Sequence, residues 1–271
     1  MAAAPRRRGG NPPVLKKFGQ HFLDDRAILK RIVDALAPTR EDTVIEIGPG
    51  RGSLTEILAE RAGRLIAVEI DRALSARLSE RYPGDGRVSI VQADVLSTDL
   101  HVLAGPEFLL IGNVPYYITT PIVFKALEPP IPRRSVFLVQ REVAERMAAH
   151  ENEDNYGALT VNLSVVARVE VVFDVPPEAF RPPPKVWSSV VILVPLEQPL
   201  VPAESLPAFR AFVQNCFGMR RKQIQKVLRS VREVSSETIA TALASVGIDP
   251  TARPENVSPV QFAHLFEILS S

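Results

Sequence analysis

The chain has 271 residues, of which 46% are hydrophobic and 23% charged, and its formal net charge is +1. This length and composition fit one large globular domain, alone or with a small second one. The near-zero charge argues against a protein that coats nucleic acid with its whole surface. No apolar run reaches the ~20 residues of a membrane helix. Arg6 to Arg8 precede no apolar stretch, so the start does not resemble a secretory signal, and we expect a cytoplasmic protein.

Residues 1–13 are basic and rich in small residues, proline and glycine, which predicts a disordered tail. After it, runs typical of buried strands alternate with helical periodicity up to residue 149. The expected strands are 43–47, 64–70, 88–92, 108–111 and 135–140, and the expected helices are 25–36, 54–62, 73–82, 121–127 and 141–149. This alternation predicts βαβ units around a parallel sheet.

The pattern changes in the second half of the chain. Strands at 169–175 and 188–193, joined by a proline-rich loop, predict a hairpin at one edge of the sheet. Four prolines between residues 195 and 207 indicate a linker, and only helical patterns follow it, at 208–217, 222–231, 236–246 and 259–269. We therefore expect an α/β domain of the Rossmann-like kind at 14–196 and a small all-helical domain at 197–271.

A glycine turn follows the first predicted strand, with Gly48, Gly50 and Gly52 in a G-x-G-x-G spacing. Ligands of open α/β sheets bind beyond the carboxyl ends of the strands, and glycines let the backbone approach them. The turn lacks the last glycine of G-x-G-x-x-G, which favours an adenosine ligand without a pyrophosphate, such as S-adenosylmethionine. A nicotinamide dinucleotide is the alternative.

Two acidic residues end the next two predicted strands. Glu69 is placed to accept hydrogen bonds from both hydroxyls of a ribose, and Asp94 from the adenine amine of the cofactor. Taken alone, a glycine turn and acids at strand ends can belong to the fold only. A suitable group at each of three strand ends favours a cofactor site.

The fourth predicted strand stops at Asn113, followed by Pro115 and Tyr116. The side-chain oxygen of Asn113 and a main-chain carbonyl next to Pro115 would accept the two N–H groups of an aromatic amine. They would thereby aim its lone pair at a methyl donor. Tyr116 would stack on the base, as aromatic side chains do with extruded bases. Such a displacement needs positioning rather than a strong base, and no His/Cys/Asp cluster predicts a metal. A tight turn with Tyr116 in the core is the structural alternative.

With these motifs in order, the sequence closely resembles the ribosomal RNA adenine dimethyltransferase family. The residues that carry the resemblance are 17–23, 46–50, 69–71, 94–96, 112–116, 180–186, 220–222 and 253–258. The resemblance implies dimethylation of two adjacent adenosines near the 3′ end of 16S rRNA, in the 30S subunit or its precursor. It further implies an S-adenosylmethionine cofactor, and we expect a monomer without a metal or a membrane partner.

The resemblance also implies roles for individual residues. The implied cofactor contacts are His21, Leu23, Gly48, Gly50, Glu69, Asp94 and Asn113. Phe180 is implied to cover the target base opposite Tyr116, although a loop anchor in the core is an equal alternative for it. Arg220, Arg221 and Lys222 are implied to bind RNA phosphates. Two positions depart from the family pattern: His21 replaces Asn, and Trp187 replaces Asp.

Two other functions remain open from the sequence. One is the related methylation of adenine in 23S rRNA that confers macrolide resistance. The other is a non-catalytic RNA-binding assembly or transcription factor on the same fold, against which the intact Gly48, Glu69, Asp94 and Asn113 speak.

Overall fold

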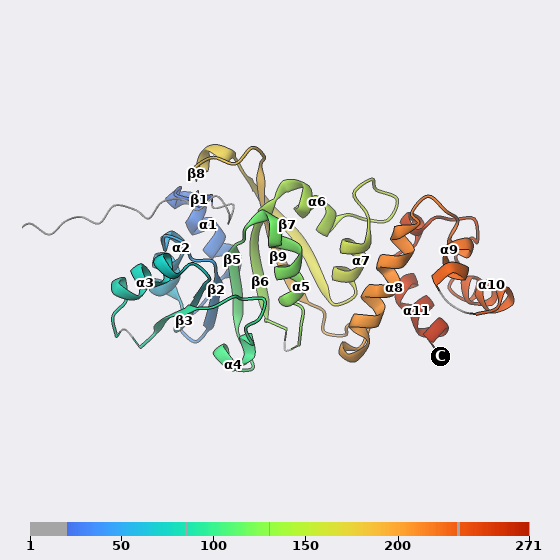
Figure 1. Cartoon of the computed structure of the whole chain (residues 1–271), viewed down its shortest axis with the longest axis horizontal. Coiled ribbons are helices and arrows are strands. Elements are labelled where there is room, and N and C mark those ends of the chain that lie inside the picture. Colours follow the sequence, from blue (N-terminus) through green and yellow to red (C-terminus); the bar gives the residue numbers. More distant parts are fainter. Residues whose placement is uncertain (1–20, 85, 130, 232–233, 271) are drawn as a thin grey trace, which may run out of the picture.

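The computed structural model of the chain describes residues 21–84, 86–129, 131–231 and 234–270. Its centre is a seven-stranded sheet in the order β4-β3-β2-β5-β6-β9-β7, and the last helices follow on one side (Figure 1). The strands of this sheet are β2 (Thr43–Ile47), β3 (Arg64–Glu69), β4 (Val88–Gln92), β5 (Leu109–Asn113), β6 (Arg134–Gln140), β7 (Ala167–Val175) and β9 (Ser188–Pro195). The predicted tail at 1–13 lies outside the described residues.

Helices precede, connect and follow the parallel strands β2 to β6, and they cover both faces of the sheet. They are α1 (Arg26–Leu36), α2 (Ser53–Arg61), α3 (Arg72–Arg81), α4 (Leu100–Ala104), α5 (Thr119–Lys125) and α6 (Arg141–Ala148). Asp25 and Asp71 begin α1 and α3 by accepting hydrogen bonds from backbone amides of the first turn. The predicted α/β class is therefore confirmed, and α4 is an addition to it.

The strands β7 and β9 form the predicted antiparallel hairpin, with β9 paired to β6. Because β9 runs against β6, Ser188 at the start of β9 lies opposite Gln140 at the end of β6. The start of β9 thus reaches the same edge of the sheet as the carboxyl ends of the parallel strands.

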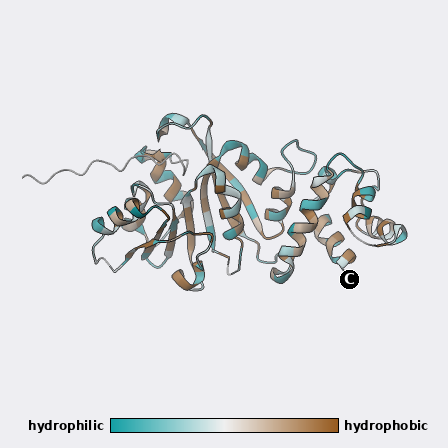
Figure 2. Cartoon of the chain, in the orientation of Figure 1, coloured by the Kyte–Doolittle hydropathy of each residue, from teal (hydrophilic) through white to brown (hydrophobic). Residues whose placement is uncertain are grey.

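Alternation along the strands builds a hydrophobic layer on each face of the sheet. In β6, Val136 and Leu138 belong to one buried cluster and Phe137 and Val139 to the other. Figure 2 shows the hydrophobic colour concentrated on the strands and on the inward sides of the helices. Strands buried on both faces explain why these segments read as nearly continuous apolar runs.

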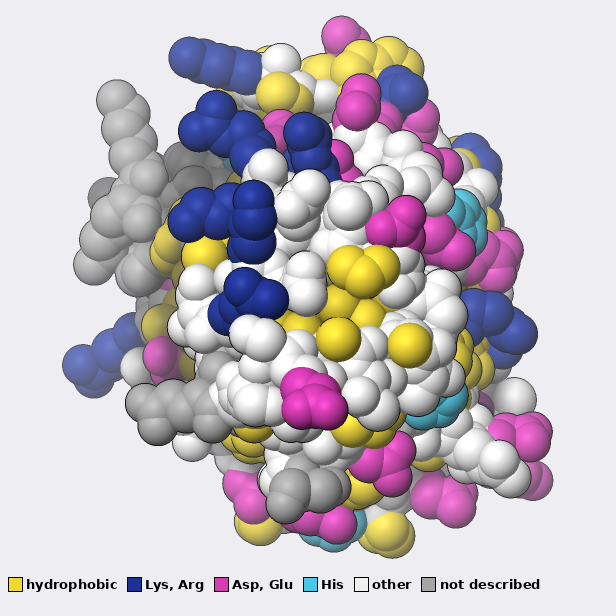
Figure 3. All heavy atoms as spheres, turned by 90° about the vertical axis from the view of Figure 1, so that its right-hand side faces the viewer, with side chains coloured by type: hydrophobic (Ala, Val, Ile, Leu, Met, Phe, Trp, Pro, Cys, Tyr) yellow, Lys and Arg dark blue, Asp and Glu magenta, His cyan; other side chains and the backbone are white. Residues whose placement is uncertain are grey.

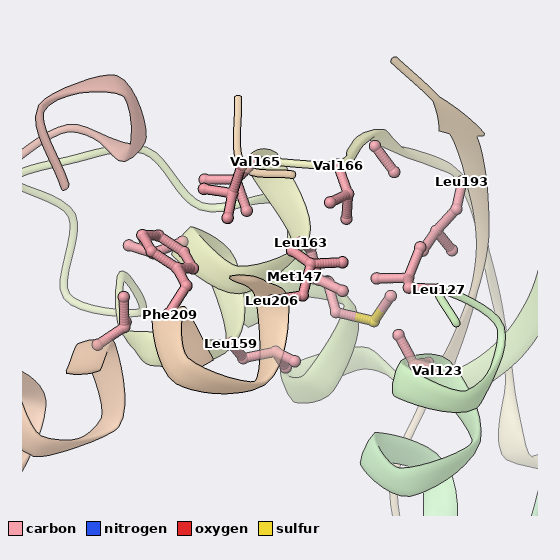
Figure 4. Packing of buried hydrophobic residues seen from close by; sticks show 14 of the residues in the cluster. Val123, Leu127, Met147, Leu159, Leu163, Val165, Val166, Leu193, Leu206 and Phe209 are labelled. Carbon is pink, nitrogen blue, oxygen red and sulfur yellow. The ribbon is translucent and has the colours of Figure 1, made fainter. Parts of the chain in front are cut away.

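The C-terminal helices share one of these two layers with the sheet. These helices are α8 (Leu206–Gly218), α9 (Ile224–Val231), α10 (Ser236–Ser245) and α11 (Pro259–Ser270), and α7 (Ala158–Ser164) packs between α8 and the sheet domain. Leu159 and Leu163 of α7 lie between Phe209 of α8 and Val123 of α5 in the close view (Figure 4). The core is thus continuous across residue 197, and the domain boundary placed there stays a prediction.

A buried tyrosine adds a polar link between the two parts. The Tyr156 hydroxyl donates to the main-chain oxygen of Val257 at 2.6 Å, and Tyr156 is 1% exposed. Burial is the main cause that raises the pKa of this hydroxyl. It therefore remains a donor at every ordinary pH.

None of the helices within the described ranges is long and apolar enough to cross a bilayer. In the same ranges no group of three or more His, Cys, Asp or Glu side chains is arranged to hold a metal ion. The side chain of Cys216, in α8, is buried.

Candidate active site

A cavity with about 850 Å³ of empty space, open to solvent, lies at the carboxyl edge of the parallel strands. Its walls come from the ends of β2, β3, β4 and β5, from the turn and helix after β5, and from His21 and the start of β1 (Phe22–Leu23). Seven of the residues expected at the site line it: His21, Gly48, Glu69, Asp94, Asn113, Pro115 and Tyr116. This position is the one at which α/β sheets bind their ligands.

The glycine turn after β2 depends on backbone conformations that side chains disfavour. Gly48 and Gly50 have φ of 64° and 58°, and a Cβ on Gly50 would lie 2.9 Å from the Phe22 ring. The Gly48 amide donates to the Val68 carbonyl at 2.9 Å, so the turn is fastened to β3. Glycine at position 48 lets the main chain line the cavity, and glycine at position 50 lets the turn pass close to the Phe22 ring.

Glu69 is held by backbone amides on both of its oxygens. Oε2 accepts from Gly50 N at 3.0 Å and Oε1 from Asp71 N at 2.9 Å. Burial raises the pKa of this carboxyl, and the two amide bonds oppose the rise. Each oxygen keeps a second lone pair, so the fixed carboxylate can still accept hydroxyl groups of a ligand.

Asp94 lies at the exposed rim of the same cavity. Its Oδ1 accepts from the Leu96 amide at 2.9 Å, which fixes the direction of the carboxylate. Each of the two acids is followed by an apolar residue, Ile70 and Val95, that also lines the cavity. The sequence reasoning missed these apolar walls, although their position next to each acid was the available signal.

Asn113 has a defined amide orientation. Its Nδ2 donates to the main-chain oxygen of His21 at 3.3 Å, and only the NH₂ end of an amide can donate to a carbonyl. The Oδ1 atom is therefore the end left for a ligand amine. The N-terminal segment, far away in sequence, thus orients the side chain expected to accept the N–H group.

The structure also indicates which main-chain carbonyl near Pro115 is free to accept the second amine hydrogen. The Pro115 carbonyl already accepts from Ile118 N at 3.1 Å and from Thr119 Oγ1 at 3.4 Å, where a 3-10 turn begins. The Val114 carbonyl is then the candidate for a second amine hydrogen. Both acceptors would lie within three residues of the end of β5.

Tyr116 is fixed at both its hydroxyl and its ring. The hydroxyl is 2.8 Å from Ser188 Oγ, and the ring stacks on His21 with centroids 5.8 Å apart and planes at 23°. Burial raises the pKa of the phenol, although the Ser188 bond opposes this. His21 Nδ1 lies 2.8 Å from the Pro182 carbonyl, so that nitrogen carries the proton. Tyr116 thus faces the cavity and is not a core residue.

Phe180 does not lie where the resemblance implied. It is 0% exposed, belongs to the core cluster beneath α1 and does not line the cavity. The reason is the two-residue ladder between β1 and β8 (Phe180–Arg181), in which Leu23 pairs with Phe180 and draws it inward. In this structure Phe180 has the environment of the alternative, a loop anchor in the core, and its role over the target base stays a prediction.

Two expected cofactor contacts lie beside the cavity and not on its wall. Leu23 is 4% exposed with its side chain in the core, and it borders a smaller adjoining cavity. Gly50 supports the site indirectly, through its hydrogen bond to Glu69. A residue that the sequence reasoning missed is Glu46, which is 1% exposed and has a buried Oε2 without a hydrogen-bond partner among the described residues.

The basic residues after α8 do not all have the same environment. Arg220 is bound to Glu255 and to the Asp154 carbonyl, so it ties α8 to neighbouring loops. Arg221 and Lys222 are exposed, as are Lys226 and Arg229 on α9. Figure 3, which faces the C-terminal helices, shows Lys and Arg side chains gathered along one side of this surface. A basic surface of this kind suits a polyanion.

Known proteins are similar to this chain over almost its whole length. The family described as ribosomal RNA adenine dimethylase matches residues 14–271. The ribosomal RNA small subunit methyltransferase A of Bordetella avium is 42% identical over 255 residues, which cover 94% of each chain. The enzyme of the same name from Caldanaerobacter subterraneus is 39% identical and covers 94% of this chain and 96% of its own.

Two solved structures share the overall fold. A dimethyladenosine transferase from Plasmodium falciparum has a TM-score of 0.77 and 26% identity, covering 91% of this chain and 96% of its own. The 23S rRNA methyltransferase ErmE has a TM-score of 0.73 and 30% identity, covering 92% of this chain and all of its own. Both similarities extend over the sheet and the C-terminal helices.

Proposed function

Since the chain belongs to the ribosomal RNA adenine dimethylase family, we propose that it methylates N6 of two adjacent adenosines near the 3′ end of 16S rRNA. The methyl donor is S-adenosylmethionine, and the substrate is the 30S subunit or its precursor in the cytoplasm. The enzyme acts as a monomer. The small-subunit methyltransferase relatives favour this substrate over 23S rRNA because they are more similar than the 23S enzyme.

The observation that carries the proposal is the orientation of Asn113. Its amide nitrogen is bound to His21 O, and its oxygen is left to accept an N–H of the target amine. A second acceptor at the Val114 carbonyl draws the nitrogen toward a tetrahedral shape. That shape restores a lone pair which an aromatic amine otherwise shares with its ring.

The other residues of the cavity bind the cofactor. Glu69, Gly48 and Asp94 would hold the adenosine part of the cofactor, with Ile70 and Val95 as apolar walls. The bound cofactor would supply an electrophilic methyl group on a sulfonium, leaving as a neutral thioether while the amine proton goes to water. Asn113 and the Val114 carbonyl would hold the amine nitrogen in position, and positioning is what such a transfer mostly needs.

Tyr116 supplies the stacking surface for the extruded adenine. Its ring is held by Ser188, so it keeps its position when the base arrives. His21 stacks on this ring in the structure described here, and a base that enters replaces or extends that stack. Arg221 and Lys222 bind phosphates away from the reaction centre.

The test is methyl transfer to defined particles. Labelled S-adenosylmethionine is incubated with the protein and either undermethylated 30S subunits or 50S precursors, and the modified base is mapped. Transfer to two adjacent adenosines of 16S rRNA is expected. Transfer only to 23S rRNA, or to neither particle, would refute the proposed substrate.

Asn113→Ala tests the pocket itself. It should reduce the transfer rate at least ~100-fold, since it removes an acceptor placed at the reacting nitrogen. Cofactor binding, measured by calorimetry, should persist at a reduced affinity. Asn215→Ala, an exposed asparagine on α8, is the matched control and should transfer like the wild type.

A further inference from the structure

Exposed apolar side chains lie at several places along the edge of the sheet that carries the cavity. Ile70 and Tyr117, which are 51% and 60% exposed, line the cavity itself. Val186 and Trp187, at 44% and 47%, come immediately before β9. A soluble surface rarely presents several large apolar side chains together without a partner. Trp187 is thus an exposed aromatic side chain at this edge that does not line the cavity.

The main chain of Trp187 has a fixed place relative to Tyr116. Its neighbour Ser188 lies within 2.8 Å of the Tyr116 hydroxyl, and consecutive Cα atoms are about 3.8 Å apart. The Trp187 carbonyl accepts from the amide of Arg141, the first residue of α6, at 3.0 Å. The main chain of Trp187 is thus held next to Ser188, the residue that fixes the Tyr116 ring.

Two exposed cationic residues lie near the main chain of this tryptophan. Lys185 comes two residues before it. Arg141, the first residue of α6, donates its amide to the Trp187 carbonyl, and its guanidinium also pairs with Glu145 and Asp174. Aromatic rings interleaved with cations are the means by which proteins hold single-stranded nucleic acid without reading its sequence. The chemistry of this edge fits an unpaired RNA segment next to the target base.

We propose that Trp187 is a positioning residue that stacks on the nucleotide adjacent to the target adenosine. This inference rests on the proposed function, because it requires an RNA substrate with unpaired neighbours of the target. While one adenosine occupies the cavity, its neighbour lies on the Trp187 ring and its phosphate lies near Lys185. The stack keeps the two adjacent nucleotides splayed apart.

Kinetics on the natural particle test the proposal. Trp187→Ala should lower kcat/KM for undermethylated 30S subunits by roughly 5- to 100-fold, the range expected for loss of one base stack. Trp187→Phe should recover most of this loss, because it keeps an aromatic face. Cofactor affinity and Tm should stay at their wild-type values in both variants. Val102→Ala, which removes an exposed apolar side chain on α4, is the control.

The sole tryptophan of the chain supplies a second readout. Its fluorescence should be quenched when a short RNA with two adjacent unpaired adenosines binds, and Trp187→Phe gives the background. A kcat/KM of Trp187→Ala within twofold of Val102→Ala would overturn the proposal. So would equal losses in the Ala and Phe variants, or unquenched fluorescence with bound RNA. If the wild type itself transfers no methyl groups to 30S subunits, the proposed substrate is refuted, and the role of Trp187 is not. The same variants are then compared on the particle that the wild type does methylate.

Discussion

Glu46 lies one residue before the end of β2, beneath the glycine turn, and its burial has a measurable consequence. The side chain is 1% exposed, and burial raises the pKa of its carboxyl from 4.5 to about 8. The folded protein therefore keeps this group protonated at pH 7, whereas the unfolded chain releases the proton. Folding at pH 7 must take up one proton at Glu46.

The sign follows from the raised pKa. Below pH 4.5 the group is protonated in both states, and its contribution to stability is complete. As the pH rises from 4.5 to about 8, the unfolded state gains stability from ionisation and the free energy of unfolding falls. Above about 8 the loss is constant. The gap between the two pKa values corresponds to at most about 5 kcal/mol.

Glu46→Gln removes this titration while it keeps the shape of the side chain. Urea unfolding followed by circular dichroism at pH 5 to 9 gives the free energy of unfolding of both proteins. The free energy of unfolding of the variant, relative to that of the wild type, should rise by about 2–4 kcal/mol between pH 5 and 8.5. A buried NH₂ group without a partner costs about 1–3 kcal/mol at every pH, so such a cost shifts the whole pH profile and leaves its slope unchanged.

The control for the loss of charge is Glu170→Gln, in which the exposed glutamate lies on the edge strand β7. A difference between wild type and Glu46→Gln that stays constant from pH 5 to 9 would refute the reasoning. It would mean that the carboxyl has the same pKa in the folded and the unfolded state, and that burial does not keep it protonated.

Three further outcomes are expected. Phe180→Ala should lower the free energy of unfolding by about 3–5 kcal/mol, and Phe180→Leu by much less. The Leu variant should keep its transfer activity, and loss of activity at a normal Tm would contradict a purely structural role in the core. Tyr156→Phe should lose about 1–3 kcal/mol in urea unfolding, because the Val257 carbonyl is left unpaired; an unchanged midpoint would contradict the link. Arg221→Ala with Lys222→Ala should reduce the salt slope of RNA binding by about 2, whereas Arg220→Ala should mainly lower Tm; equal slopes for all proteins would count against this patch.

The parallel sheet and most of its helices were predictable from the sequence because local patterns encode them. Strands buried on both faces are nearly continuous apolar runs, and the helices between them have one apolar side. The site was also predictable in outline. The carboxyl ends of parallel strands meet at one edge, so Gly48, Glu69, Asp94 and Asn113 had to come together if the strands were assigned correctly.

Features that depend on distant partners were not predictable. The helix α7 is short and almost wholly buried, so no polar side marks its periodicity. The strands β1 and β8 have two residues each and exist only as partners of one another. Whether Phe180 points into the core or over the cavity depends on that pairing. Local proline spacing contains no information about it.

The site also depends on contacts between segments that are made at different times during synthesis. His21 meets Pro182, 161 residues later, and Tyr116 meets Ser188, 72 residues later. A nascent chain that ends before residue 188 has the glycine turn and both acids but lacks the partner that holds Tyr116. Contacts of such separation close late in folding. A partly synthesised enzyme is therefore incomplete at its base-binding ring, and the active site matures only after the edge hairpin has been made.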